Sequence, residues 1–220
     1  MYDRPRITLA EELLLLSAVP ETGQLKQPWY FDRVLAGAVL TDLLLAGAIA
    51  VEGRQITRVR PLPLGDPVGD HVLDALAREG KSRWSLRIER WLDKILHDVS
   101  APYPSVDQPY LEALAARGQL RAQPRFRILG LFPYTAWYAT EPGSRAEPAR
   151  RIADVAGVWR PDCRPPLDDR DLHRAALAGA GGLQYRLFPG RGHRDIRHRI
   201  RELTRSTPIA EEVRKAIEDE

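Results

Sequence analysis

The chain has 220 residues, of which 44% are hydrophobic and 29% charged, and its formal net charge is +3 at pH 7. This balance predicts one globular domain with a full core and excludes global disorder, and the longest apolar runs, 13–16 and 43–49, are too short to span a membrane. No signal peptide is visible over residues 1–6 and the only cysteine is Cys163, so we expect a cytoplasmic protein without an internal disulfide.

Capping signals and apolar periodicity predict the first elements. Thr8 and Glu11 have the spacing of a capping box, in which two side chains satisfy free backbone N–H groups at a helix start. Asp66 followed by Pro67 is a second start signal, because aspartate caps a helix and proline suits its first turn. In chain order we expect a helix after Thr8, a longer helix from Trp29 to Ala46, a hairpin over 48–60, and helices over 66–80 and 85–96.

The second half is expected to contain one long hairpin among further helices. Ser105 is a candidate cap, and Ser144 with Glu147 repeats the capping-box spacing. In chain order we expect a helix over 105–118, a hairpin from Leu120 to Thr140, a helix after Ser144, a helix capped by Asp168 or Asp169, and helices over 193–205 and 208–218. The predicted fold class is mainly α: a tail over 1–6, then one globular helical domain over 7–220 with two surface β-hairpins.

Residues with catalytic potential form no recognised constellation. The segment Gly190-Arg191-Gly192 lacks the context of a phosphate loop, and His193 and His198 are five residues apart, which does not place two metal ligands on one helical face. Acidic residues at 168, 169 and 171 suit the first turn of a helix without a metal. We therefore predict no catalytic residue, no metal and no cofactor.

Two stretches carry arginines in patterns that suit an anionic surface. In the second hairpin Arg125 and Arg127 alternate with aromatic residues, as at a bilayer interface, although an ordinary hairpin with solvated arginines has the same pattern. In the helix over 193–205, four arginines (194, 197, 201 and 205) lie opposite an apolar face. This helix could attract anionic lipid or nucleic acid, but we favour a simple solvated face. Arginine supplies nearly all the positive charge and asparagine is absent, a skew that GC-rich coding explains.

Several segments, in order, resemble the Golgi phosphoprotein 3 family. The most specific is Asp66-Pro67-Val68-Gly69-Asp70-His71-Val72-Leu73-Asp74, which is similar to the family's Pro-x-Gly-Asp-x-x-Leu-Asp segment. The other segments are Thr8 to Glu12, Leu43 to Gly47, Trp91-Leu92 with Ile95-Leu96, and Leu114 to Gly118. The resemblance covers about residues 7–218. It implies a helical core with β-hairpins, no catalytic activity, and a basic pocket for the headgroup of phosphatidylinositol 4-phosphate.

The resemblance also implies which side chains form that pocket: a tryptophan before the second helix, an arginine within it, and two arginines at the start of the helix before the long hairpin. Trp29 matches the tryptophan after a shift of about two residues, whereas the arginines fall at Ala36, Pro104 and Asp107. These three residues cannot supply the charge-assisted donors that a phosphate dianion needs. Our candidates for a looser site, taken from the charge pattern of this chain, are Arg33, Arg121, Arg125 and Arg127.

We interpret the chain as a bacterial-type peripheral protein that binds anionic phospholipid or phosphoinositide at the cytoplasmic face of a membrane. It would hold a protein partner there or form a homo-oligomer, with Leu131, Phe132 and Trp137 of the hairpin contacting the membrane. One alternative is a soluble scaffold of the same fold; another, less favoured, is a winged-helix-like nucleic-acid binder, because a helix followed by a hairpin outlines that motif. Trp29 has two interpretations, a lipid contact or a residue packed against the core.

Overall fold

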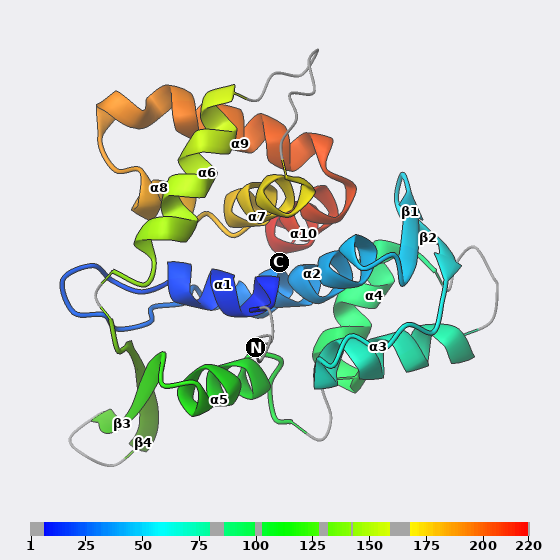
Figure 1. Ribbon diagram of the computed structural model, residues 1–220, viewed down its shortest axis with the longest axis horizontal. Coiled ribbons are helices and arrows are strands. Elements are labelled where there is room, and N and C mark those ends of the chain that lie inside the picture. Colours follow the sequence, from blue (N-terminus) through cyan, green and yellow to red (C-terminus); the bar gives the residue numbers. More distant parts are fainter. Residues whose placement is uncertain are drawn as a thin grey trace, which may run out of the picture.

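The computed structural model describes residues 7–79, 86–99, 103–127, 132–141, 143–158 and 168–219. In these ranges the protein has ten α-helices and two separate antiparallel hairpins, which confirms the mainly α fold class (Figure 1). The helices and strands are α1 Leu9–Leu16, α2 Phe31–Leu45, β1 Ile49–Glu52, β2 Gln55–Val59, α3 Pro67–Arg78, α4 Ile88–Lys94, α5 Gln108–Ala116, β3 Leu120–Arg127, β4 Phe132–Ala139, α6 Ala146–Val158, α7 Asp169–Ala180, α8 Gln184–Leu187, α9 Arg194–Ser206 and α10 Pro208–Glu218.

Helices α1 and α2 lie across the middle of the molecule (Figure 1). Helices α6 to α10 lie above them in that view and α3 and α5 below, so both central helices are covered on two sides. The core follows from this arrangement: seven of the eight residues of α1 are buried, and α2 buries ten of its fifteen. One cluster of buried side chains runs from Leu9 to Val213 and includes residues of every layer.

Two glycines allow the central helices to pack closely. A Cβ atom on Gly37 of α2 would lie 2.5 Å from Val213 Cγ2 and 3.1 Å from Leu177 Cδ2, so α10 and α7 approach the α2 backbone directly. A Cβ on Gly181, just after α7, would lie 2.9 Å from Val34 Cγ2. Such approaches are tighter than real Cβ contacts, and a larger residue would therefore force these helices apart.

The predicted start signals of α1 and α3 are formed. Thr8 Oγ1 accepts from the Glu11 N–H at 3.2 Å and Glu11 Oε2 accepts from the Thr8 N–H at 2.9 Å, which completes the capping box. Asp66 Oδ1 accepts from the Val68 N–H, and its Oδ2 accepts from the Tyr110 hydroxyl at 3.0 Å. The segment that resembles the family motif therefore has a structural role: it starts α3 and ties it to α5.

The two hairpins occupy the predicted places. Strands β1 and β2 pair from Ile49–Val59 to Glu52–Gln55, and β3 and β4 pair from Leu120–Ala139 to Arg127–Phe132. The segment before α2 extends the second hairpin, because the Leu25 N–H donates to Trp137 O and the Ala139 N–H donates to Gly23 O, both at 2.8 Å. The second hairpin is thus held against the start of the chain.

Three predicted boundaries or caps are wrong. Helix α4 starts at Ile88 rather than 85, because the Ile56 N–H donates to Leu86 O and so attaches the preceding residues to β2. Asp107, not Ser105, is the N-cap of α5. The Ser144–Glu147 box is not formed: the Ser144 hydroxyl has no hydrogen-bond partner among the described residues, and the Glu147 carboxylate binds Arg150 and Arg151. The short helix α8 was not predicted. Leu131 and Cys163 lie outside the described residues.

Candidate functional site

Trp29 is an exposed aromatic residue at the start of α2. Its side chain is 75% exposed and packs edge-on against Tyr30, with ring centres 5.6 Å apart. Phe31, two residues later, is 1% exposed and fills the core in its place. The interpretation of Trp29 as a core residue is therefore wrong, and its indole is available at the surface.

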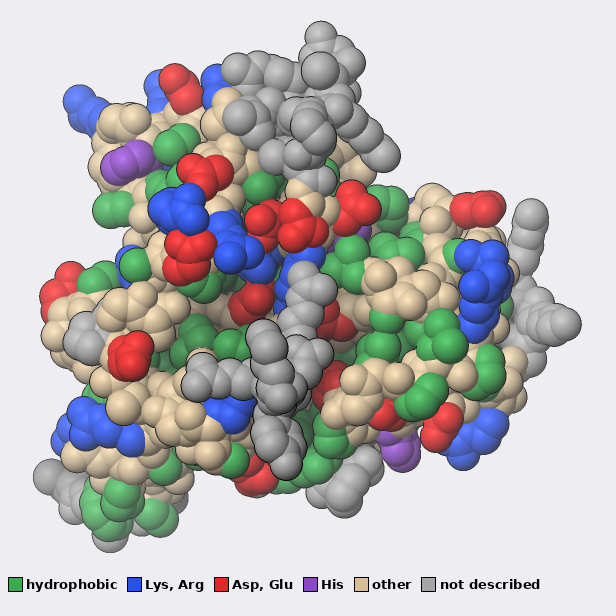
Figure 2. Space-filling model, viewed as in Figure 1, with side chains coloured by type: hydrophobic (Ala, Val, Ile, Leu, Met, Phe, Trp, Pro, Cys, Tyr) green, Lys and Arg blue, Asp and Glu red, His purple; other side chains and the backbone are tan. Residues whose placement is uncertain are grey.

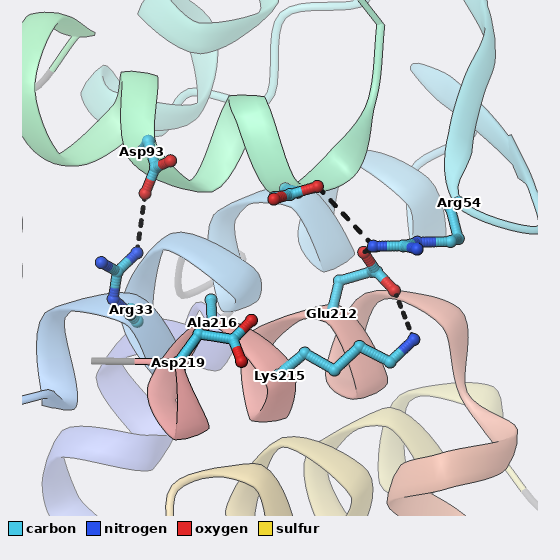
Figure 3. Close-up of a pocket in the computed structure, with 8 residues that line it drawn as sticks. Arg33, Arg54, Asp93, Glu212, Lys215, Ala216 and Asp219 are labelled. Carbon is cyan, nitrogen blue, oxygen red and sulfur yellow. Dashed lines mark hydrogen bonds and ion pairs between the residues drawn. The ribbon is translucent and has the colours of Figure 1, made fainter.

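Arg33 lines a pocket of about 170 Å³ between α2, α4 and α10. Its Nη1 donates to Asp93 Oδ1 at 2.7 Å, and Figure 3 shows this pair on one side of the pocket. On the other side Glu212, a 2% exposed carboxylate, accepts from Arg54 Nε at 2.8 Å and Lys215 Nζ at 3.0 Å. The lining residues are Arg33, Arg54, Glu89, Asp93, Glu212, Lys215, Ala216 and Asp219. With three basic and four acidic side chains, the pocket does not suit a phosphate dianion.

The positions that the resemblance assigns to a phosphate pocket are not basic. Ala36 is fully buried inside α2, and Asp107 begins α5. Burial, and then the charge of Asp107, raise the pKa of the Asp32 carboxyl to about 6. A phosphate group placed here would meet negative charge, so this part of the surface is unsuited to phosphatidylinositol 4-phosphate.

Arg121 and Arg125 lie on one face of the second hairpin and stack on Tyr138. Their guanidinium carbons are 5.0 and 6.0 Å from the centre of the Tyr138 ring, and Arg125 Nη2 donates to the Tyr138 hydroxyl at 3.1 Å. Both arginines are exposed, and neither forms an ion pair with a carboxylate in the described part of the chain. The hairpin therefore presents two oriented positive charges to solvent.

The other hairpin candidates are placed differently. Trp137 is half-buried and packs against the core. Phe126, which we did not select, is 64% exposed, and Figure 2 shows hydrophobic side chains at this end of the hairpin. Arg127 and Phe132 are paired in the β-ladder, but their side chains, like Leu131, lie outside what the structure describes.

A connecting segment brings the hairpin and Trp29 together. Gln24 pairs with Tyr138 across an antiparallel bridge, and the chain then passes Lys26 to reach Trp29. Arg186 of α8 donates to Lys26 O at 2.5 Å and to Ser17 O at 3.0 Å, which fixes this segment against the helical layer. The candidate site is therefore a surface that runs from the hairpin to the start of α2.

The fold and this surface define a class: a mainly helical protein with surface hairpins whose candidate site is exposed and carries aromatic and basic side chains. Among the described residues no group of three or more His, Cys, Asp or Glu can hold a metal ion, and no helix has the length and apolar character to cross a membrane.

The family model of Golgi phosphoprotein 3 (GPP34) matches residues 9–219. The chain therefore belongs to the Golgi phosphoprotein 3 family. A comparison with individual curated proteins gives no match.

Proposed function

We propose that the protein binds reversibly to the surface of membranes that contain anionic phospholipid, as a peripheral protein without catalytic activity. The observation that carries the proposal is the 75% exposure of Trp29 at a helix start. A tryptophan in this position exposes a large apolar surface to water, and the indole ring with its N–H group is stabilised at the boundary between headgroups and acyl chains. Membrane contact would remove that apolar surface from water.

The charges on the second hairpin favour an anionic bilayer over a neutral one. Arg121 and Arg125 are exposed and held in place by Tyr138, so they can meet lipid phosphates without breaking an ion pair between described residues. Attraction of this kind is long-ranged, adds up over several arginines and weakens as salt rises. We place the membrane contact at the cytoplasmic face, where the protein would hold a protein partner or a second copy of itself. A soluble scaffold of the same fold is the alternative if vesicles are not bound.

The first prediction is that Trp29→Ala weakens binding to vesicles containing phosphatidylglycerol by about tenfold, because burial of one large apolar side chain is worth roughly 1.5–3 kcal/mol. The melting temperature should stay near that of the unmodified protein, since the ring contributes little to the core. Co-sedimentation with vesicles and thermal unfolding measure the two quantities. Leu62→Ala is the matched control, because Leu62 is also exposed, at 43%, but lies in the β2–α3 connection. A large drop in melting temperature with unchanged vesicle binding would refute the lipid contact.

The second prediction concerns the headgroup. Since Ala36, Pro104 and Asp107 replace the basic residues of the family pocket, recognition should depend on surface charge density and not on one phosphoinositide. Vesicles with phosphatidylinositol 4-phosphate and vesicles with phosphatidylglycerol, matched in surface charge, should bind with affinities within about threefold of each other. A strong preference for the phosphoinositide at matched charge would show that other side chains form a specific pocket.

A further inference from the structure

The segment from α8 through α9 is unusually basic. Residues 184–205 contain seven arginines and only two acidic residues. Three of these arginines bind backbone carbonyl groups inside the fold: Arg186 binds Ser17 and Lys26, Arg197 binds Phe188 and Gly190 at 2.5 and 2.6 Å, and Arg199 binds Ala156 and Gly157 near the end of α6. These three arginines therefore stabilise the fold.

The other four arginines, Arg191, Arg194, Arg201 and Arg205, have no such role. None of them forms an ion pair with a carboxylate of the described residues; the Glu202 carboxylate of α9 lies 3.3 Å from His198 Nε2 instead. Arg194, His198, Arg201 and Arg205 are spaced by four, three and four residues, which places them along one side of the helix. Ile200 and Leu203, which are 0% and 1% exposed, occupy the opposite side and hold α9 in the core. The basic side of α9 is therefore fixed toward solvent over about 16 Å of helix.

Exposed aromatic residues continue this basic side toward Trp29. Tyr185 of α8 is 54% exposed, and its hydroxyl accepts from Arg201 Nη1 at 3.2 Å. Three residues before Tyr185, a Cβ on Gly182 would lie 3.3 Å from the Tyr30 hydroxyl, and Tyr30 in turn contacts Trp29. We call the surface formed by Tyr30, Tyr185, Arg194, Arg201 and Arg205 the aromatic-basic strip. Trp29 borders it through Tyr30, and Trp29 and Tyr185 are two of the four exposed large apolar residues of the described chain.

We propose that the aromatic-basic strip is a second contact surface with the anionic bilayer, so that the membrane meets α8 and α9 as well as Trp29 and the hairpin. This proposal rests on the proposed function. The tyrosine and tryptophan rings lie at headgroup depth, and the arginines of α9 bind lipid phosphates beside them. A bilayer is favoured over a nucleic acid because the strip is continuous with the exposed indole of Trp29.

The test uses the full chain and three variants: Tyr185→Ala, the double variant Arg201→Ala/Arg205→Ala, and the matched control Arg58→Ala/Arg60→Ala. Arg58 and Arg60 are exposed, form no ion pair with a described carboxylate, and lie on and just after β2, so the control loses the same charge elsewhere. Binding is measured to vesicles of phosphatidylcholine with phosphatidylglycerol, to phosphatidylcholine alone, and to mixed-sequence duplex DNA, all at low salt.

We expect the Arg201/Arg205 variant to lose about tenfold or more in affinity for the anionic vesicles, because each arginine near such a surface contributes several-fold. Tyr185→Ala should weaken binding in the same direction, and the control should remain within about threefold of the unmodified protein. Melting temperatures should be unchanged. If a variant melts at a lower temperature, vesicle binding of the single variant Arg205→Ala tests the proposal instead. The exposed Arg205 side chain has no hydrogen bond or ion pair with the described residues, so its removal should leave the fold unchanged.

Two results would overturn the proposal while the proposed function stands. In the first, Trp29→Ala loses vesicle binding but the strip variants bind like the Arg58/Arg60 control. In the second, the strip variants lose duplex DNA binding and keep vesicle binding, which would make α9 a nucleic-acid surface. If the unmodified protein does not bind anionic vesicles at all, the proposed function fails and this proposal fails with it.

Discussion

Replacement of Arg174 with alanine is expected to destabilise the protein by about 3–5 kcal/mol, because it removes a buried guanidinium and leaves the half-buried carboxylates of Glu12 and Asp171 without their nearest partner. The Arg174 side chain is 3% exposed; its Nε donates to Glu12 Oε2 at 2.5 Å and its Nη1 pairs with Asp171. The neighbouring Arg170 binds Asp42 Oδ1 at 3.0 Å and also Glu12 at 3.4 Å. This network joins α1, α2 and α7, the helices around which the rest of the fold packs.

Denaturant unfolding followed by circular dichroism measures the loss. Arg150→Ala is the control, since Arg150 of α6 also binds two carboxylates but is exposed, and an exposed pair contributes about 0–1 kcal/mol. Figure 2 shows charged side chains of both signs over the region where α1, α6 and α7 meet. The double variant Glu12→Gln/Arg174→Met should be less destabilised than Arg174→Ala, because it removes both charges. Equal, small effects of Arg174→Ala and Arg150→Ala would show that the buried network contributes no more than a surface pair.

The second large effect is expected from Trp91→Ala, with a loss of about 3–5 kcal/mol, which is usual for truncation of a buried aromatic residue. Trp91 is fully buried in α4, where that helix packs against α2 and α10, and the Lys94 ammonium lies 4.9 Å from its ring centre. Vesicle binding, measured below the lowered melting temperature, should be retained. Trp29→Ala should give the reverse pattern: normal stability and weakened binding.

The same assays separate the two tryptophans. Trp91→Phe should cost less than Trp91→Ala, because a smaller aromatic ring fills part of the space. If Trp91→Ala unfolds at the temperature of the unmodified protein, the packing of α4 described here is wrong. If Trp91→Ala is fully folded yet loses vesicle binding, the membrane contact involves α4 and not the start of α2.

Local signals predicted much of the fold because they act within a few residues. The capping box at Thr8 and Glu11 and the Asp66-Pro67 start are each completed by atoms close in the chain. The apolar periodicity of α2 and α9 predicted which sides face the core, and Ile200 and Leu203 are buried as that pattern requires. The local signals gave a wrong helix start where a distant segment binds the same residues. The residues just before Ile88 bind β2, so α4 starts at Ile88 and not at the predicted residue 85.

The sequence by itself determined the mainly α class, the two hairpins, the family relation and the basic character of the arginine-rich helix. Only the tertiary structure decided which of two nearby aromatic residues enters the core: Trp29 is exposed and Phe31 is buried. Both are large aromatic residues, so their chemistry does not separate them, and the direction of each side chain depends on how the chain turns at the start of α2. It also decided which arginines are available. Arg197 and Arg199 bind carbonyl groups of other segments and Arg33 binds Asp93 of α4, whereas Arg201 lies beside an exposed tyrosine of α8. Periodicity assigns a side chain to a side of its own helix, but its partners come from segments that only folding brings near.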